Sequence, residues 1–438
     1  MTIDAMADAA DLHLPPSDAS QMHLPPSDTS QMHLPPSDTS QMHLPPSDAS
    51  QMRPTWCDVD LDALERNLAT IRRHVGSAEV VPVVKANAYG HGIAPVGLAL
   101  QGAGVSCVAV AYVEEALALR AAGVTTDIHV LGGAVKRQIS LFVTHDLILT
   151  APSVEKLRQI DEAAAAAGST ARAHLKIDTG MERIGIHHYN ADRLIEASLR
   201  CDSVRIEGVF SHFANADAAD LSDARTQLDR FSEAVSFYER RSLPTPMRHM
   251  AASAAIARLP EAHLDRVRPG IALYGVSPTP EIAASLPTEP VMSWHSEVVY
   301  FKVVPAGASV GYGSTWTAPQ QTRVITLPVG YADGYARSLG SGSTGEGASV
   351  LVDGVPHRVV GHVCMDQTMV NIGDSSAYNG DRVTLVGTHG DERITVADLA
   401  RWSGRSPYEV LTGISLRVPR VYRRTDAPQC GPVTGEAR

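Results

Sequence analysis

Short apolar runs alternate with helix-like stretches between residues 80 and 273, and this alternation limits the possible folds more than any other feature. The stretches between the runs, such as VEEALALRAAG, carry apolar residues at helical spacing. Strands that alternate with helices favour a parallel sheet, and eight of them over about 200 residues predict a (β/α)8 barrel of the TIM type. A doubly wound open sheet is the alternative. The predicted strands are 80–85, 106–111, 127–131, 146–149, 172–177, 205–210, 247–250 and 266–273.

The pattern changes after about residue 290. Segments such as SEVVYFKVVPAGASVGYG and GASVLVDGVPHRVVGHV are β-branched runs separated by Gly, Pro and Asp. They predict a mainly antiparallel β domain behind the barrel. The predicted organisation is therefore a tail at 1–51, a barrel at 52–290, a β domain at 291–424 and a flexible tail at 425–438.

The first fifty residues contain a repeat. Four ten-residue units of the type QMHLPPSDTS follow one another from Asp11, each with a Pro pair and few apolar side chains. Such units cannot offset the entropy of ordering, so residues 1–51 are predicted to be disordered, with polyproline II character. The repeat is interpreted as a passive tail. The alternative is an interaction tail that binds metal through His13, His23, His33 and His43.

Charge and cysteine content exclude several functions. The net charge is −11, and residues 1–51 supply seven Asp and no Glu, Lys or Arg, so the remainder carries −4. Neither nucleic acid nor a membrane surface is expected as a partner. Five scattered Cys without a C-x-x-C pair indicate a reducing, cytoplasmic location and no metal site. The sequence contains no run of 18 apolar residues, so no transmembrane helix is predicted.

Lys85 is the first candidate for chemistry, because it closes the apolar run VVPVVK and is one of only five lysines. Reactive groups in such barrels lie at the carboxyl ends of the strands. An amine that is partly removed from water loses its charge more readily, which suits a nucleophile that forms a Schiff base. The alternative is a lysine whose charged end simply reaches water.

Other charged groups follow the fifth and sixth predicted strands. Lys176 and Asp178 end HLKIDTGMERIG, with Arg183 behind them, and a structural ion pair is as compatible with this pattern as a functional site. His212 ends the sixth strand in GVFSHFANAD. A single histidine at a strand end is more often structural than catalytic.

The seventh and eighth strands predict a phosphate site. Ser253 stands at a strand-to-helix junction, and Gly270 and Ile271 follow the eighth strand, where small residues let backbone N–H groups point outward. The sequence has no G-x-x-x-x-G-K-[ST] loop, so a nucleoside triphosphate is not favoured. A phosphate site together with a strand-end lysine fits pyridoxal 5′-phosphate.

Seven motifs extend this interpretation. In order, they are VVPVVKANAYGHG, HLKIDTGMERIGI, RPGIALYG, SVGYGSTW, VGYADGY, CMDQTMV and RVPRVY, and together they resemble the alanine racemase family over residues 54–424. The resemblance implies a pyridoxal-phosphate barrel and a C-terminal β domain, with the strand at 55–60 joining the latter. It also implies a head-to-tail homodimer with shared active sites.

The resemblance assigns roles to individual residues. Lys85 and Tyr312 would be the two catalytic bases, Lys85 acting on D-alanine and Tyr312, from the other subunit, on L-alanine. Lys85 would also bind the cofactor covalently. Lys176 would be a carbamylated lysine that positions Arg183. The other cofactor-binding residues would be Tyr89, His212, Ser253, Arg268, Gly270, Ile271 and Tyr408, and the substrate-binding residues Arg183, Tyr331, Met365 and Asp366.

The activity implied is the interconversion of L- and D-alanine, which supplies D-alanine for peptidoglycan. One position departs from the family: HMAASAA has Ala252 where the family usually has Asn, which removes an amide near the cofactor. Racemases for serine, lysine or a broad range of amino acids therefore stay open. An amino-acid decarboxylase and a non-enzymatic cofactor carrier are further alternatives, although CMDQTMV lacks the Cys-Asp-Ser type of segment and a carrier needs no β domain.

Overall fold

The computed structural model describes residues 53–340 and 347–424. The tails predicted at 1–51 and 425–438, and the repeat within the first of them, lie outside the described residues.

The predicted barrel is confirmed, and the doubly wound sheet is not formed. All neighbours in this sheet pair in parallel, in the order β2-β10-β9-β8-β6-β5-β4-β3, with β7 attached to β6. Val83, just after β2, forms a parallel bridge with Ala109 of β3, and this bridge closes the ring. The strands are β2 (Glu79–Val80), β3 (Cys107–Val110), β4 (Asp127–Val130), β5 (Ile148–Ala151), β6 (Ala171–Asp178), β7 (Ile186–His187), β8 (Val204–Phe210), β9 (Met247–Ala252) and β10 (Arg266–Arg268).

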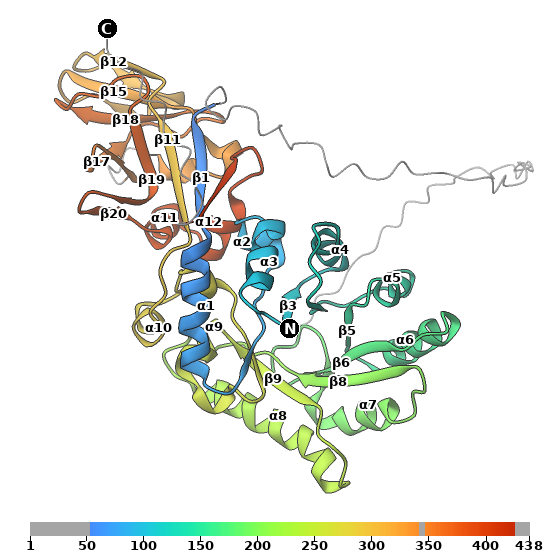
Figure 1. Cartoon of the computed structure of the whole chain (residues 1–438). Coiled ribbons are helices and arrows are strands. Elements are labelled where there is room, and N and C mark those ends of the chain that lie inside the picture. Colours follow the sequence, from blue (N-terminus) through green and yellow to red (C-terminus); the bar gives the residue numbers. More distant parts are fainter. Residues whose placement is uncertain (1–52, 341–346, 425–438) are drawn as a thin grey trace, which may run out of the picture. The chain divides into compact units, whose positions relative to one another are not determined.

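Helices cover the outside of this ring (Figure 1). α1 begins where the Asp60 carboxylate accepts from the N–H of Ala63 at 2.9 Å, and it buries Leu64, Leu68 and Ile71 on one face. The helices of this region are α1 (Leu61–Val75), α2 (Lys85–Tyr89), α3 (Ile93–Gly102), α4 (Val113–Ala121), α5 (Ile139–Thr144), α6 (Val154–Ala166), α7 (Ala191–Ser198), α8 (Ser222–Arg240), α9 (Ser253–Arg258) and α10 (Pro280–Ser285).

Three predicted strands differ from the structure. The run 80–85 keeps only Glu79–Val80 as a strand, because Pro82 has no N–H to donate, and Lys85 begins a helical turn. The fourth run lies two residues later, after Asp146 adopts a positive φ of 46°. The eighth ends at Arg268, and the apolar segment Ile271–Tyr274 is a 3-10 helix.

The mainly antiparallel β domain is also confirmed. Its main sheet follows the order β12-β15-β18-β17-β16-β19-β11-β1-β21 within the described residues, and only β1 and β21 pair in parallel. A separate hairpin, β13 with β14, carries Tyr312 at its tip. The strands are β1 (Thr55–Asp60), β11 (Met292–Glu297), β12 (Tyr300–Val304), β13 (Ser309–Val310), β14 (Trp316–Thr317), β15 (Thr322–Leu327), β16 (Ser349–Val352), β17 (Val355–Val359), β18 (Thr368–Gly373), β19 (Arg382–His389), β20 (Glu392–Ile394) and β21 (Arg420–Arg423).

The two regions share one apolar core. Most buried apolar side chains of the barrel and of the β domain form one contiguous cluster, and a second, small cluster around Val304 and Val324 lies within the β domain. Two helices of the β domain, α11 (Val396–Ser403) and α12 (Pro407–Gly413), complete it, and α12 packs against α2 beside Lys85. Among the described residues, no helix has the length and apolarity needed to span a membrane.

Candidate active site

A cavity of about 540 Å³ lies at the carboxyl ends of the barrel strands. Ten of the residues singled out from the sequence line it, although they come from positions more than 300 residues apart. They are Lys85, Tyr89, Lys176, Arg183, His212, Ser253, Arg268, Gly270, Ile271 and Tyr408.

Lys85 directs a partly buried amine toward this cavity. Burial lowers the pKa of the amine, and the positive charges of Arg183 and Arg268 lower it further, while Glu115 opposes them. A larger share of the amine is therefore neutral near neutral pH than for a lysine in water. A neutral amine is the form that attacks a carbonyl or accepts a proton.

Tyr89 and Gly270 meet at one end of the cavity. A Cβ atom on Gly270 would lie 2.4 Å from the Tyr89 hydroxyl, so only glycine allows the backbone to approach so closely. The Tyr408 ring, from the β domain, lies 6.2 Å from that of Tyr89. Burial raises the pKa of Tyr89 and brings that of Tyr408 to about 12, so both keep their hydroxyl protons.

Ser253 completes this end. Its hydroxyl oxygen accepts from the N–H of Gly270 at 3.0 Å and from that of Ala272 at 3.2 Å. Both lone pairs of the oxygen are then engaged, and the hydroxyl proton remains available. Together with the two tyrosines, this arrangement offers several O–H donors to an anion.

Arg268 lies at the floor of the cavity and is 3% exposed. Burial lowers its pKa to about 9, which still leaves the guanidinium charged at neutral pH. Among the described residues, its hydrogen-bond partners are neutral groups, which hold it in one orientation. The acceptors are His249 Nδ1 at 2.5 Å, Ser211 O at 2.8 Å, Met250 O at 3.0 Å and His212 Nδ1 at 3.4 Å.

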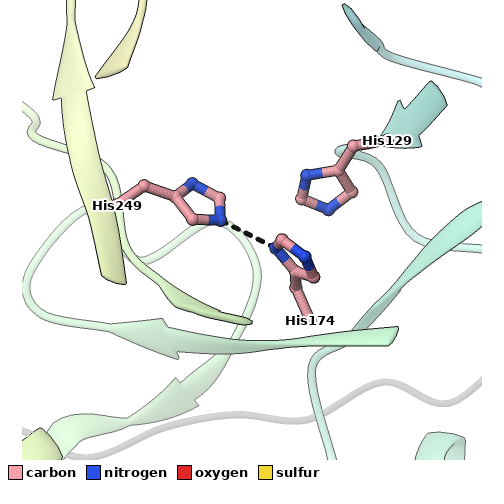
Figure 2. A group of neighbouring side chains, drawn as sticks. All are labelled: His129, His174 and His249. Atoms are coloured by element: carbon pink, nitrogen blue, oxygen red, sulfur yellow. Dashed lines mark hydrogen bonds between the residues drawn. The ribbon is translucent and has the colours of Figure 1, made fainter. Parts of the chain in front are cut away.

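Three buried histidines, His129, His174 and His249, lie together inside the barrel (Figure 2), and His249 contacts Arg268. An arginine only donates, so His249 Nδ1 accepts and its ring proton resides on Nε2. That nitrogen lies 2.8 Å from Nδ1 of His174, whose own proton must then be on Nε2. His129 lies beside His174, with ring centroids 4.4 Å apart. Burial lowers the pKa of all three rings, that of His174 to about 3.

This cluster has the donor atoms of a metal site, because one nitrogen from each ring lies within 4.8 Å of the others. Both nitrogens of His249 are already hydrogen-bonded, however. The positive charges of Arg268 and Arg266 lower the pKa of the His174 ring and would also repel a metal cation. We therefore interpret the histidines as neutral supports that orient Arg268.

Lys176 and Asp178 do not form the structural ion pair considered as an alternative. One Asp178 carboxylate oxygen accepts from the N–H groups of three successive residues, from Gly180 to Glu182, and so shapes the loop that carries Arg183. The Lys176 amine lies 4.7 Å from the centre of the Phe210 ring. Burial, followed by the charge of Arg268, holds the pKa of Lys176 well below its ordinary value.

The structure does not bring four predicted residues into the cavity. Tyr312 is 73% exposed at the tip of its hairpin. Tyr331 and Met365 lie together, because the N–H of Tyr331 donates to Cys364 and that of Ala332 to Met365. Asp366 pairs with Arg417 at 2.8 Å. These four residues, the β-domain group, are all on the surface of the β domain within the chain described.

Sequence reasoning missed several residues that line the cavity or support Arg268 from behind it. His174 and His249 face the barrel interior, and the only signal was their alternation with other inward residues, such as Lys176 two positions later. Phe210 falls inside a predicted strand, and nothing in the sequence indicates that the Lys176 amine lies over its ring. Leu131 and Tyr112, from the loops after β4 and β3, line the cavity without any distinguishing motif.

The architecture defines the class to which this protein belongs. A closed (β/α)8 barrel that gathers a buried amine and guanidinium groups at the carboxyl ends of its strands is built as an enzyme. Two family models match the chain. "Alanine racemase, N-terminal domain" matches residues 59–278, and "Alanine racemase, C-terminal domain" matches residues 291–422.

Individual relatives agree with these matches. Alanine racemase 2 of Caldanaerobacter subterraneus subsp. tengcongensis is 41% identical over 373 residues, which cover 84% of this chain and 95% of the relative. Alanine racemase of Halothermothrix orenii is 38% identical, over 85% and 97% of the two chains. The chain belongs to the alanine racemase family.

Solved structures show the same likeness. Alanine racemase from the D-cycloserine producer Streptomyces lavendulae matches with a TM-score of 0.81 at 35% identity, covering 85% of this chain and 98% of that one. The Bacillus anthracis alanine racemase with bound L-Ala-P matches with a TM-score of 0.79 at 36% identity, covering 85% and 96%. The match extends through the β domain, which a barrel-only carrier lacks.

Proposed function

We propose that this chain interconverts L-alanine and D-alanine with pyridoxal 5′-phosphate and so provides D-alanine for peptidoglycan. The observation that carries the proposal is the cavity itself, in which the partly buried amine of Lys85, with its lowered pKa, shares the lining with two guanidinium groups and a second, buried amine in a chain of the alanine racemase family. These groups suit an anionic cofactor and the carboxylate of an amino acid.

The residues present fit pyridoxal phosphate. The end formed by Ser253, Tyr89 and Tyr408 offers O–H donors to a phosphate, beside Gly270, where a Cβ would collide with the Tyr89 hydroxyl. Ile271 would contribute its backbone N–H. Lys85 would hold the aldehyde carbon, and His212 would lie against the ring. When bound, the cofactor acidifies the α-hydrogen of an amino acid attached through its amine.

Racemisation needs one proton-transferring group on each face of the α-carbon. Lys85 Nζ would accept the proton on the D face, a role favoured by its lowered pKa. Tyr312 Oη would act on the L face. Each group accepts the proton in one direction and returns one in the other.

The two arginines and the second lysine of the cavity would orient the cofactor and the substrate. Arg268 stays charged near neutral pH and would donate to the pyridine nitrogen, which then remains unprotonated. Arg183 would meet the substrate carboxylate. Burial and the charge of Arg268 lower the pKa of Lys176 and so favour the neutral amine, which is the form that reacts with CO2, and the resulting carbamate would place a negative charge among Arg183 and Arg268.

The β-domain group supports a homodimer with shared sites. Tyr312 of the partner subunit would reach the cavity, because the Tyr312 of the same chain is 73% exposed and does not line it. Tyr331, Met365 and Asp366 lie on the same domain and would form the entrance and the carboxylate side of the partner's cavity. A closed two-fold assembly supplies both sites in one step.

The experiment that tests this function is a measurement of initial racemisation rates with a panel of L-amino acids. Alanine is expected to have the highest kcat/KM. A higher kcat/KM for serine or lysine would show that this amino acid, and not alanine, is the preferred substrate. Release of CO2 from lysine would support a decarboxylase. The variant Ala252→Asn is the matched probe, because Ala252 lines the cavity and the change restores the usual family residue. It should raise the preference for alanine.

A further inference from the structure

The four residues after Lys85 adopt an uncommon backbone conformation. Ala86, Asn87, Ala88 and Tyr89 have φ values of 53°, 56°, 54° and 51°, so they form a turn of left-handed helix. None of them is glycine, and each such residue costs about 1–2 kcal/mol relative to a right-handed turn. A conformation this unfavourable persists only where the surrounding groups hold it in place.

Side chains from four directions hold this turn. The Asn87 carboxamide accepts from the N–H of Ile93 at 2.8 Å, and the His91 ring donates to the carbonyls of Ala88 and Tyr89 at 3.0 Å. Arg420, from the β domain, donates to the carbonyl of Gly90 at 2.9 Å. These contacts fix the middle and the end of the turn.

Glu115 fixes the beginning of the turn. One oxygen of its carboxylate accepts from the N–H of Ala86, directly after Lys85, at 2.5 Å. The other oxygen accepts from the N–H groups of Ala111 and Tyr112, at 2.8 and 3.2 Å, in the loop between β3 and α4. Glu115 therefore ties the residue after Lys85 to the neighbouring strand of the barrel.

We propose that Glu115 is a positioning residue for Lys85, holding the first residue of the left-handed turn so that the lysine amine meets the substrate α-carbon. Without its carboxylate, the N–H of Ala86 loses its acceptor and the turn loses one reason to keep its conformation. The Cα–Cβ direction of Lys85 would then no longer be fixed. The inference rests on the proposed function, in which Lys85 transfers the proton on the D face.

The charge of Glu115 acts in the same place. Of the groups that shift the pKa of Lys85, Arg183 and Arg268 lower it and Glu115 raises it. Loss of the carboxylate would thus lower the pKa of the amine further. Position and basicity of Lys85 would change together, and both changes would affect the step that Lys85 performs.

The first test uses substrates deuterated at the α-carbon, with the full-length enzyme loaded with cofactor. Glu115→Ala should lower kcat roughly 10²-fold, the size of loss expected from misplacing a reacting group by about 1 Å. The isotope effect with deuterated D-alanine should rise, because the step at Lys85 limits the rate more strongly. The effect with deuterated L-alanine should fall or stay constant. Glu115→Gln keeps one acceptor oxygen, so its kcat and isotope effects should lie between those of the wild type and of Glu115→Ala.

The second test does not depend on turnover. Hydrogen exchange, followed by mass spectrometry on the peptide that spans residues 85–92, should become faster in Glu115→Ala with cofactor bound. Glu114→Ala is the matched control, since Glu114 is the exposed neighbour on α4 and makes only a 3.4 Å contact with Gln138. It should change neither measurement.

The outcomes separate the two proposals. Equal changes of both isotope effects, or unchanged exchange at 85–92, would overturn the role of Glu115. A wild-type chain that racemises no alanine would overturn the proposed function instead. In that case the exchange experiment would still decide whether Glu115 holds the turn.

Discussion

The barrel and the β domain contribute to the candidate site in opposite ways. The barrel directs its chemical groups inward: Arg268 is 3% exposed and Lys176 is 5% exposed. Apart from Tyr408, which lines the cavity, the predicted site residues of the β domain point outward, with Tyr312 73% exposed and Met365 52% exposed. The barrel half of the site is thus complete within one chain, and the other half is displayed on the surface.

This difference separates two kinds of requirement. Side chains whose pKa values must be shifted, and which bind an anionic cofactor, need to be shielded from water. The core of the barrel provides this shielding. A group that reaches into another copy of the chain must be exposed in its own. The contrast predicts that defects in the barrel abolish the site of the same chain, while defects in the β-domain group affect the partner's site.

Removal of the buried amine should have the largest effect. Lys85→Ala removes both the attachment point of the cofactor and one proton-transferring group, so kcat/KM should fall roughly 10⁴-fold or more. The absorbance of the covalently bound cofactor should be lost as well. Lys302→Ala is the matched control, because Lys302 lies on the exposed strand β12. Retention of the absorbance in Lys85→Ala would contradict the assignment.

Removal of the exposed hydroxyl should have the next largest effect. Tyr312→Phe keeps the ring but not the proton, and loss of such a group typically costs about 10²–10⁴ in rate. The loss of kcat/KM should be equal for L-alanine and D-alanine, because the two enantiomers have the same free energy, whereas the cofactor absorbance should be retained. Tyr300→Phe, which alters another exposed tyrosine of the β domain, should behave as wild type. Full activity in Tyr312→Phe would disprove the two-base mechanism.

Mixing Lys85→Ala with Tyr312→Phe tests directly whether the two halves of one site come from different subunits. If the halves of the site come from different subunits, half of a randomly reassociated mixture is hybrid, and each hybrid dimer has one intact site. The mixture should therefore recover roughly a quarter of the wild-type specific activity. If Tyr312 instead acts within its own chain, each variant chain lacks one base, and mixing should restore nothing. The mass of the native particle should correspond to two chains.

Acidification should lower the stability of the fold. Burial lowers the pKa of His91 to about 4 and of His174 to about 3, so the unfolded chain binds more protons than the folded one below about pH 6.5. The free energy of unfolding should then decrease as the pH falls, by about 1.4 kcal/mol per pH unit for each such histidine. Denaturant titrations at several pH values would measure it. A flat profile between pH 6.5 and 4 would show that these rings are not kept neutral.

Periodicity predicts the architecture well because a buried parallel strand and an amphipathic helix each impose their own apolar spacing. It fails where local chemistry overrides the pattern. Pro82 shortens the strand before Lys85, and the apolar segment after Arg268 folds as a 3-10 helix because the chain must turn there to reach Ser253. No period identifies a left-handed turn of four non-glycine residues.

The site was predictable to the extent that its residues belong to motifs. Lys85 and Ser253 stand at strand ends, where reactive groups gather in barrels. His249 and Glu115 act through geometry alone, since each meets its partner only after the sheet has closed. The exposure of Tyr312 also depends on three-dimensional placement and could not be derived from its neighbours in the sequence.

The pairing of β1 has a consequence for how the chain is made. β1 is an early strand, yet it pairs with β11 and β21, and about 230 residues separate it from β11. At a synthesis rate of about 5–20 residues per second, β1 emerges from the ribosome roughly 10–50 s before its first partner. The whole barrel is translated during this wait. If the ribosome stalls after the barrel, Cys57 and Val59 therefore lack the strands that bury them. A nascent chain in that state exposes apolar side chains that a chaperone can bind.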